Sequence, residues 1–228
     1  IMIVNKIDRE NSDFFKTVEQ IQANFGRRCV PIQLPVGAES KFEGVVDLIS
    51  AKDSKAPASL ADKIASFREK LVEAVAETND NLISKYLEGT ELTEEEIQQA
   101  LRAATINNKI VPILAGSALR NKGIPELMNS ICSYLPSPND RGKIKAKNTQ
   151  TKQDEEIEPN EAGPLCALVF KTTADPYVGK LTELRVYSGI INSDSSVWNA
   201  TRNRAERIGQ LYMVRGKSQE AVGQIVAG

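Results

Sequence analysis

Two short apolar runs, each followed directly by a polar loop, constrain the fold of this chain more than any other feature. The first run is Ile1–Val4 and leads into Asn5-Lys6-Ile7-Asp8. The second is Ile110–Leu114 and is followed by Gly116-Ser117-Ala118-Leu119. Such runs are typical of buried strands in an open parallel sheet, whose ligands bind at the carboxyl ends of the strands. We therefore expect an α/β sheet with both loops at one edge.

The first loop carries groups that can recognise a guanine base. The Asp8 carboxylate can accept hydrogen bonds from the ring N1 and from the exocyclic amino group, a pair of donors that adenine does not offer. Asn5 can orient the loop and reach the base edge, and the stem of Lys6 can lie over the ring face. The alternative interpretation is a polar turn at the end of a strand.

The second loop supplies the complementary groups. The backbone N–H of Ala118 can donate to the base carbonyl, and Ser117 can hold Asp8 in place. A single Asn-Lys-x-Asp sequence arises by chance in roughly a few per cent of chains of this length, but two loops in matching positions favour guanine recognition. The predicted guanine-binding residues are Asn5, Lys6, Asp8, Ser117, Ala118 and Leu119.

The sequence offers no counterpart for the other half of a nucleotide site. It has no Gly-x-x-x-x-Gly-Lys-Ser/Thr, no Asp-x-x-Gly and no histidine. We interpret the nearest approach, Gly216-Lys217-Ser218, as a surface turn. Phosphate cradling, magnesium binding and water activation therefore have no predicted residues here, neither catalytic nor metal-binding. With an isoleucine opening what reads as a buried strand, we expect this chain to be part of a longer polypeptide.

Composition excludes several classes of function. Apolar residues make up 41% and charged residues 26%, with a net charge of −1, which is ordinary for a soluble globular protein and lacks the basic excess of a self-sufficient nucleic-acid binder. We find no membrane span and no signal peptide. The three cysteines lie in apolar surroundings, and we expect buried, reduced thiols in a cytosolic protein.

Helical spacing of apolar residues predicts helices in the first two thirds of the chain. Ser12 is the candidate N-cap of the first, and Thr93 with Glu96 forms a predicted capping box for a later one. We expect strands over 29–34 and 42–49. The predicted helices cover 14–25, 64–87 with a break near 79–81, 93–104 and 124–135.

The pattern changes at Gly163-Pro164. Short apolar segments separated by turn residues then predict a small β-barrel that lacks its last strands. Residues 139–162 are polar and charged, which indicates either a linker or a weak edge hairpin. The predicted strands cover 165–170, 181–187, 190–191, 197–198, 208–214 and 222–226.

Several longer runs make the chain recognisable. Over its whole length it resembles elongation factor G, the ribosomal translocase family. The resemblance rests on Asn5–Asp8 and on the runs 33–37, 42–48, 85–89, 116–123, 134–138, 175–181 and 185–189. The long insertion between the two guanine loops, followed by the barrel signature, is highly specific for that family.

The resemblance implies the domain organisation. Residues 1–138 would be the C-terminal part of a P-loop GTPase-type α/β domain, with an inserted α+β subdomain at about 38–108. Residues 139–163 would be a linker, and 164–228 an incomplete all-β barrel. The segment 49–60 is shorter than is usual in the family, which leaves open a divergent paralogue such as a ribosomal protection, release or recycling factor. A non-catalytic ribosome-binding module is a further alternative.

The resemblance also implies partners. The intact parent would be a cytoplasmic, monomeric GTPase that binds GTP or GDP with magnesium, whereas this part alone would be catalytically inactive. The acidic turn Glu94–Glu96 would meet the ribosomal stalk protein, although compensation of the helix dipole explains the same residues. The barrel would contact small-subunit ribosomal RNA, and the candidate residues there are Arg185, Tyr187, Arg202, Arg204 and Arg207.

Overall fold

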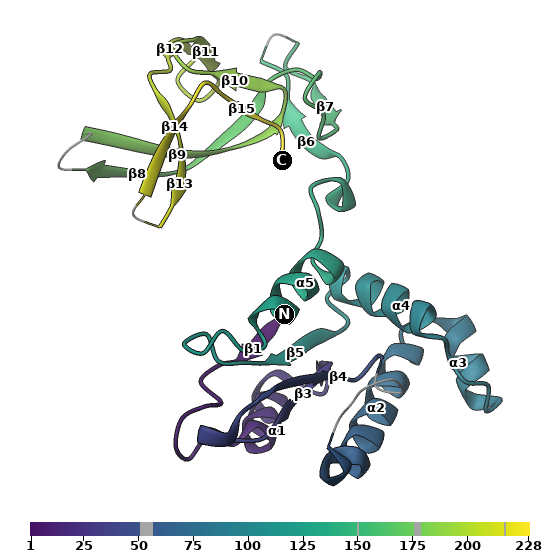
Figure 1. The fold of residues 1–228 in the computed structure, drawn as a ribbon. Coiled ribbons are helices and arrows are strands. Elements are labelled where there is room, and N and C mark those ends of the chain that lie inside the picture. Colours follow the sequence, from purple (N-terminus) through teal and green to yellow (C-terminus); the bar gives the residue numbers. More distant parts are fainter. Residues whose placement is uncertain (51–56, 150, 176–178, 217) are drawn as a thin grey trace. The chain divides into compact units, whose positions relative to one another are not determined.

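The protein is described by a computed structural model that covers residues 1–50, 57–149, 151–175, 179–216 and 218–228. Parts of the shortened segment 49–60, of the run 175–181 and of the turn at Gly216–Ser218 lie outside these described residues. The chain forms two compact units, Ile1–Leu135 and Pro136–Gly228 (Figure 1).

A three-stranded parallel sheet lies at the centre of the first unit. Its strand order is β1 (Met2–Val4), β5 (Val111–Ala115) and β2 (Cys29–Pro31). In the register, Val4 pairs with Ala115, so β1 and β5 end side by side. The structure therefore confirms the predicted parallel sheet, with the two polar loops leaving from the same edge.

Between β1 and β5 the chain forms helices and a second, antiparallel pair of strands. Helix α1 (Phe14–Phe25) begins after Asp13, whose side chain accepts the Lys16 N–H at 3.0 Å. The predicted N-cap, Ser12, is therefore wrong by one residue, because its hydroxyl instead donates to the Ile7 carbonyl at 2.6 Å. The predicted strand 29–34 is divided into β2 and β3 (Gln33–Val36), and β3 pairs antiparallel with β4 (Gly44–Asp47).

Among the described residues, the first unit has four further α-helices: α2 (Ala61–Ala76), α3 (Asp80–Leu87), α4 (Glu94–Ile106) and α5 (Ile124–Tyr134). The break between α2 and α3 falls where the sequence predicts it, since the Asn79 side chain caps α3. The predicted capping box of Thr93 and Glu96 is also present. The short 3₁₀ turns are η1 (Glu39–Lys41), η3 (Ala58–Leu60) and, in the second unit, η4 (Asn139–Arg141).

One hydrophobic core joins these elements. Leu34, Leu71, Leu101, Ile113 and Leu114 are all fully buried, so β3, β5, α2 and α4 contribute side chains to the same interior. Within the described residues, no helix is long and apolar enough to cross a membrane.

The second unit is built from antiparallel strand pairs. The region 139–163 contains the hairpin of β6 (Ile144–Lys147) and β7 (Asp154–Ile157), one of the two alternatives for it. The long ribbon of β8 (Cys166–Asp175) and β9 (Gly179–Ser188) follows. The remaining strands are β10 (Ile190–Asn192), β11 (Ser196–Asn199), β12 (Arg204–Arg207), β13 (Leu211–Arg215), β14 (Ser218–Val222) and β15 (Gln224–Val226).

Two predictions about this unit and the thiols need correction. Strand β12 was not predicted, because Arg-Ala-Glu-Arg has no apolar alternation, and the predicted strand 208–214 is β13, which starts at Leu211. Cys29 is buried as expected, but Cys132 is exposed and Cys166 is partly exposed; all three are free thiols. An amphipathic helix can place a cysteine on its outer face, as α5 does with Cys132. The α/β unit and the following β unit agree with the predicted fold class.

Candidate functional site

The two predicted guanine loops meet at the carboxyl ends of β1 and β5. The Gly116 N–H donates to the Val4 carbonyl at 3.0 Å, and the Ile7 N–H donates back to the Gly116 carbonyl at 3.4 Å. These backbone bonds extend the β1–β5 pairing into the loops. The sheet thereby fixes the separation of two segments that are far apart in sequence.

Asn5 joins the loops through its side chain. Its Oδ1 accepts the Ala118 N–H at 3.0 Å and the Lys6 N–H at 2.8 Å. Lys6 adopts a left-handed backbone conformation with φ 65°, which is uncommon for a residue with a side chain. The Ala118 N–H, which the sequence assigns to the base carbonyl, therefore has a partner already, and a base would have to share or displace Asn5.

Asp8 is the buried anion of this site. Its side chain is only 5% exposed, and Ser117 is fully buried. The hydrogen bond from the Ser117 side chain holds the pKa of the Asp8 carboxyl below its ordinary value, although burial acts in the opposite direction. The nearby charges of Arg120 and Arg9 also lower this pKa. Asp8 is thus an ionised acceptor at neutral pH, held by the residue that the sequence predicts to hold it.

Lys6 and Leu119 lie at the rim. Both are exposed, Leu119 with 79% of its surface accessible. Neither side chain has a described contact that assigns it to the site, so both remain predictions. Their exposure leaves them accessible to the faces of a flat ring.

Arg120 belongs to this site although sequence reasoning did not select it. Its Nε lies 3.5 Å from Asp8 Oδ2, and its Nη1 donates to the Ser40 carbonyl at 3.1 Å. The sequence does contain a signal for Arg120, because it is a cation three residues after Ser117, in a loop that is predicted to hold a carboxylate. Lys122 reaches the same region and donates to the Phe42 carbonyl at 2.8 Å.

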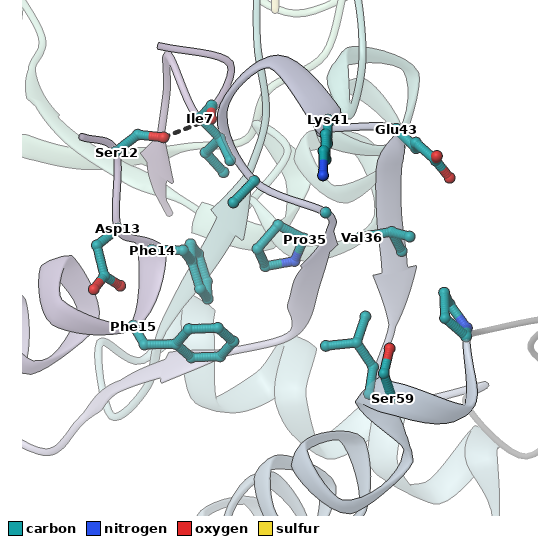
Figure 2. Close-up of a pocket in the computed structure, with 14 residues that line it drawn as sticks. Ile7, Ser12, Asp13, Phe14, Phe15, Pro35, Val36, Lys41, Glu43 and Ser59 are labelled. Carbon is teal, nitrogen blue, oxygen red and sulfur yellow. Dashed lines mark hydrogen bonds between the residues drawn. The ribbon is translucent and has the colours of Figure 1, made fainter. Parts of the chain in front are cut away.

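A surface cavity of about 590 Å³ lies next to the loops. Phe14 and Phe15 stand on one side of it, and Val36 and Lys41 lie across from them (Figure 2). Ile7 also lines it, but its described lining includes none of the six predicted guanine-binding residues. This cavity is therefore not the predicted base site.

The described residues contain no cluster of metal-ligating side chains. Nowhere among them do three histidine, cysteine, aspartate or glutamate side chains gather in a way that could hold a metal ion. The groups present suit a base edge: one buried carboxylate, backbone amides and an exposed lysine stem.

Several of the candidate partner residues make contacts within the chain. Glu96 forms the capping box and pairs with Lys85. These two contacts account for the Glu96 carboxylate, and no partner protein is needed to explain it. Arg202 and Arg204 both pair with Glu206, at 3.3 and 3.2 Å. Arg185 lies over the Tyr187 ring at 5.6 Å, and Arg207 is exposed. These exposed pairs are weak and can be exchanged for phosphate contacts at little cost.

Comparison with known proteins identifies the family of the chain. Residues 1–137 match the family model described as elongation factor Tu GTP binding domain, and residues 164–228 match the one described as elongation factor G domain 2. The chain is also similar to a crystal structure of a protein from Thermus thermophilus, with 27% identity and a TM-score of 0.76. That match covers 99% of this chain and 32% of the other, so this chain spans about a third of its length. The chain belongs to the translational GTPase family that carries the elongation factor Tu GTP-binding domain.

Proposed function

We propose that the loops after β1 and β5 read the base of a guanine nucleotide. The observation that carries this proposal is the convergence of the two loops, joined by the hydrogen bond from the Ala118 N–H to Asn5 Oδ1 at 3.0 Å. The ionised, buried Asp8 carboxylate lies at the same edge of the sheet. The membership of a GTP-binding family supports the same ligand class.

The hydrogen-bond donors and acceptors of Asp8, Ser117 and the base indicate what each group does in the proposed site. A carboxylate has about four lone-pair positions, of which the Ser117 side chain and the Asp8 backbone N–H use two. The remaining positions can accept the N1–H and the exocyclic amino group of guanine. Adenine has an unprotonated N1 and no amino group at C2, so it leaves the buried carboxylate unpaired, which disfavours its binding.

A titration of the 228-residue chain with mononucleotides tests base recognition. Because few base contacts without phosphate contacts support only weak binding, we expect a Kd for GMP of about a millimolar and no saturable response to AMP. Amide shifts in ¹⁵N-labelled protein measure both. Equal responses to the two nucleotides would contradict guanine recognition, and micromolar binding would contradict the absence of phosphate contacts.

Replacement of Asp8 tests its role. In Asp8→Asn, one acceptor oxygen is replaced by an NH2 donor group, which matches the second carbonyl of xanthine and opposes the amino group of guanine. We expect GMP affinity to fall about 10- to 100-fold and affinity for xanthosine monophosphate to rise. Unchanged preference in this variant would mean that Asp8 is not the base reader.

We further propose that the chain is part of elongation factor G, a cytoplasmic, monomeric, ribosome-dependent GTPase that moves tRNA and mRNA. The match of residues 164–228 to elongation factor G domain 2, after a GTP-binding domain, supports this assignment. In this proposal the longer protein supplies the phosphate, magnesium and hydrolysis residues. The barrel arginines contact small-subunit ribosomal RNA, and the α4 surface around Glu94–Glu96 meets the stalk protein.

The coding sequence upstream of Ile1 and a translocation assay decide between the candidates. A phosphate-binding Gly-x-x-x-x-Gly-Lys-Ser/Thr upstream, with ribosome-stimulated GTP hydrolysis and mRNA movement in the longer protein, is the expected result. Hydrolysis without mRNA movement would instead favour a ribosomal protection or release and recycling factor. Ribosome binding that persists in Asp8→Asn and needs no nucleotide would favour a non-catalytic binding module.

A further inference from the structure

Arg120 lies where three segments of the first unit meet. Its backbone N–H donates to the Ser117 side-chain oxygen at 3.3 Å. Its guanidinium approaches Asp8 Oδ2 at 3.5 Å and also donates to the Ser40 carbonyl at 3.1 Å. One residue thus contacts the serine and the aspartate of the proposed base site and a third segment outside it.

That third segment, residues 37–42, is bonded to both loops; we name it the bridging segment. On the side of the first loop, the Glu39 N–H donates to the Ile7 carbonyl at 2.9 Å, and Glu39 Oε1 accepts the Asn11 N–H at 2.7 Å. On the side of the second loop, Lys122 donates to the Phe42 carbonyl at 2.8 Å. The segment therefore reaches both loops as one piece, with Phe42 buried as its anchor.

The bridging segment begins with a tight turn at Gly37. Gly37 has φ +76°, and a Cβ built there would lie 2.0 Å from the Lys41 carbonyl oxygen. Only a glycine fits such a position. The Ser40 carbonyl, which accepts from Arg120, therefore lies in a segment held by this turn and by hydrogen bonds to both loops.

The charges explain why a fixed cation matters to Asp8. Burial disfavours the ionised carboxylate, and the Ser117 hydrogen bond, Arg120 and Arg9 oppose that effect. At 3.5 Å the Arg120 Nε sits beside one carboxylate oxygen without occupying all of its acceptor positions. The cation can hold the carboxylate in the orientation that a base requires and still leave room for the base.

We propose that Arg120 is a positioning residue of the guanine site, which orients the Asp8 carboxylate and fastens it to the bridging segment through the Ser40 carbonyl. This inference rests on the proposed guanine recognition. Arg120 touches no reacting atom in this role, and it acts on the nucleotide only through Asp8. Because Arg120 joins Asp8 to the Ser40 carbonyl, the bridging segment also becomes part of the base site.

The test compares Arg120→Gln and Arg120→Lys with the wild-type 228-residue chain. Arg28→Gln is the matched control, because Arg28 is an exposed arginine that precedes β2, at the opposite edge of the parallel sheet. We expect Arg120→Gln to weaken GMP binding about three- to tenfold and the control to leave it unchanged. Amide spectra of each variant establish that the fold is retained.

A second measurement distinguishes a lost interaction between Arg120 and the Asp8 carboxylate from a general destabilisation of the site. The ¹³C signal of the Asp8 carboxyl, followed from neutral to acid pH, gives the midpoint of its protonation. The midpoint should move upward in Arg120→Gln, because a neighbouring positive charge is lost, and should stay near the wild-type value in Arg120→Lys. GMP binding by the wild type should fail below that midpoint, and in Arg120→Gln it should fail at a higher pH.

Gly37→Ala tests the bridging segment independently. It leaves Arg120 and Asp8 in place but forces the segment to move, so we expect weaker GMP binding here too. The inference is wrong if the Asp8 midpoint and the GMP affinity are both unchanged in Arg120→Gln, or if affinity rises, since Arg120 would then compete with the base. If the wild type shows no preference for GMP over AMP, guanine recognition itself fails, and the Asp8 midpoint alone still decides whether Arg120 holds the carboxylate.

Discussion

Gly123 is the residue at which the proposed site depends most directly on backbone geometry. It precedes helix α5 with φ 76° and ψ 0°, and it closes the loop that begins at Ser117. A Cβ built on it would lie 2.4 Å from the Ala115 carbonyl oxygen and 3.1 Å from the Gly116 Cα. Both atoms belong to the backbone at the end of β5 and cannot yield as a flexible side chain would.

The cost of Gly123→Ala follows from two contributions. A left-handed conformation costs an alanine about 1–2 kcal/mol, and an overpacked contact adds about 1–3 kcal/mol. The first unit should therefore lose about 2–5 kcal/mol of its free energy of unfolding. Gly89→Ala is the matched control, since Gly89 has φ +74° with nothing within 4 Å of its built Cβ. That variant should lose only the conformational contribution.

In a urea titration, the unfolding of each unit can be followed by its own spectroscopic signal. Within the described residues, every α-helix lies in the first unit, and the single tryptophan, Trp198, lies in the second. With a urea dependence of about 2 kcal/mol per molar, the circular dichroism midpoint at 222 nm should fall by about 1–2.5 M in Gly123→Ala and by about 0.5–1 M in Gly89→Ala. Trp198 fluorescence should keep its midpoint. Equal shifts in the two variants would refute the backbone clash.

Three further predictions concern single side chains. Thr93→Ala removes the capping box and should cost the first unit about 1 kcal/mol, read from the same urea midpoint, whereas exposed Thr90→Ala should cost little; equal losses would contradict the cap. Burial raises the pKa of Tyr134 to about 12 from an ordinary 10.0, so its contribution to stability is complete below pH 10 and is lost as pH rises toward 12. Tyr134→Phe should lack that alkaline loss, and an identical alkaline decline in both proteins would refute it. Asn5→Ala should speed hydrogen exchange of the Ala118 amide about fivefold, because that amide loses its acceptor; unchanged exchange would show that the bond is unimportant in solution.

Local sequence signals predicted the sheet and the meeting of the loops. Apolar runs that end in polar loops identified β1 and β5, and parallel pairing then required their carboxyl ends to be neighbours. The capping box at Thr93 was equally readable, because both of its bonds lie within a single turn of chain. In each case the determining interactions are either local or imposed by one regular sheet.

The missed features depend on contacts between distant segments. Strand β12 pairs with β11, although its own residues carry no alternating pattern, so only the partner strand makes it a strand. Arg120 acquires its role from Asp8 and from the Ser40 carbonyl, both of which lie far from it in sequence. The bond between Asn5 and Ala118 was unforeseen for the same reason. Spacing within a segment contains no information about such contacts.

Joint observation of Asp8 and Ala118 tests most directly whether the two loops read one base. The Asp8 carboxyl carbon and the Ala118 amide of the labelled chain are followed in a single titration with GMP. If the loops form one site, both signals move along the same binding curve with one Kd, and inosine monophosphate, which lacks the exocyclic amino group, gives a weaker curve for both. Separate curves, or movement of only one signal, would contradict the account.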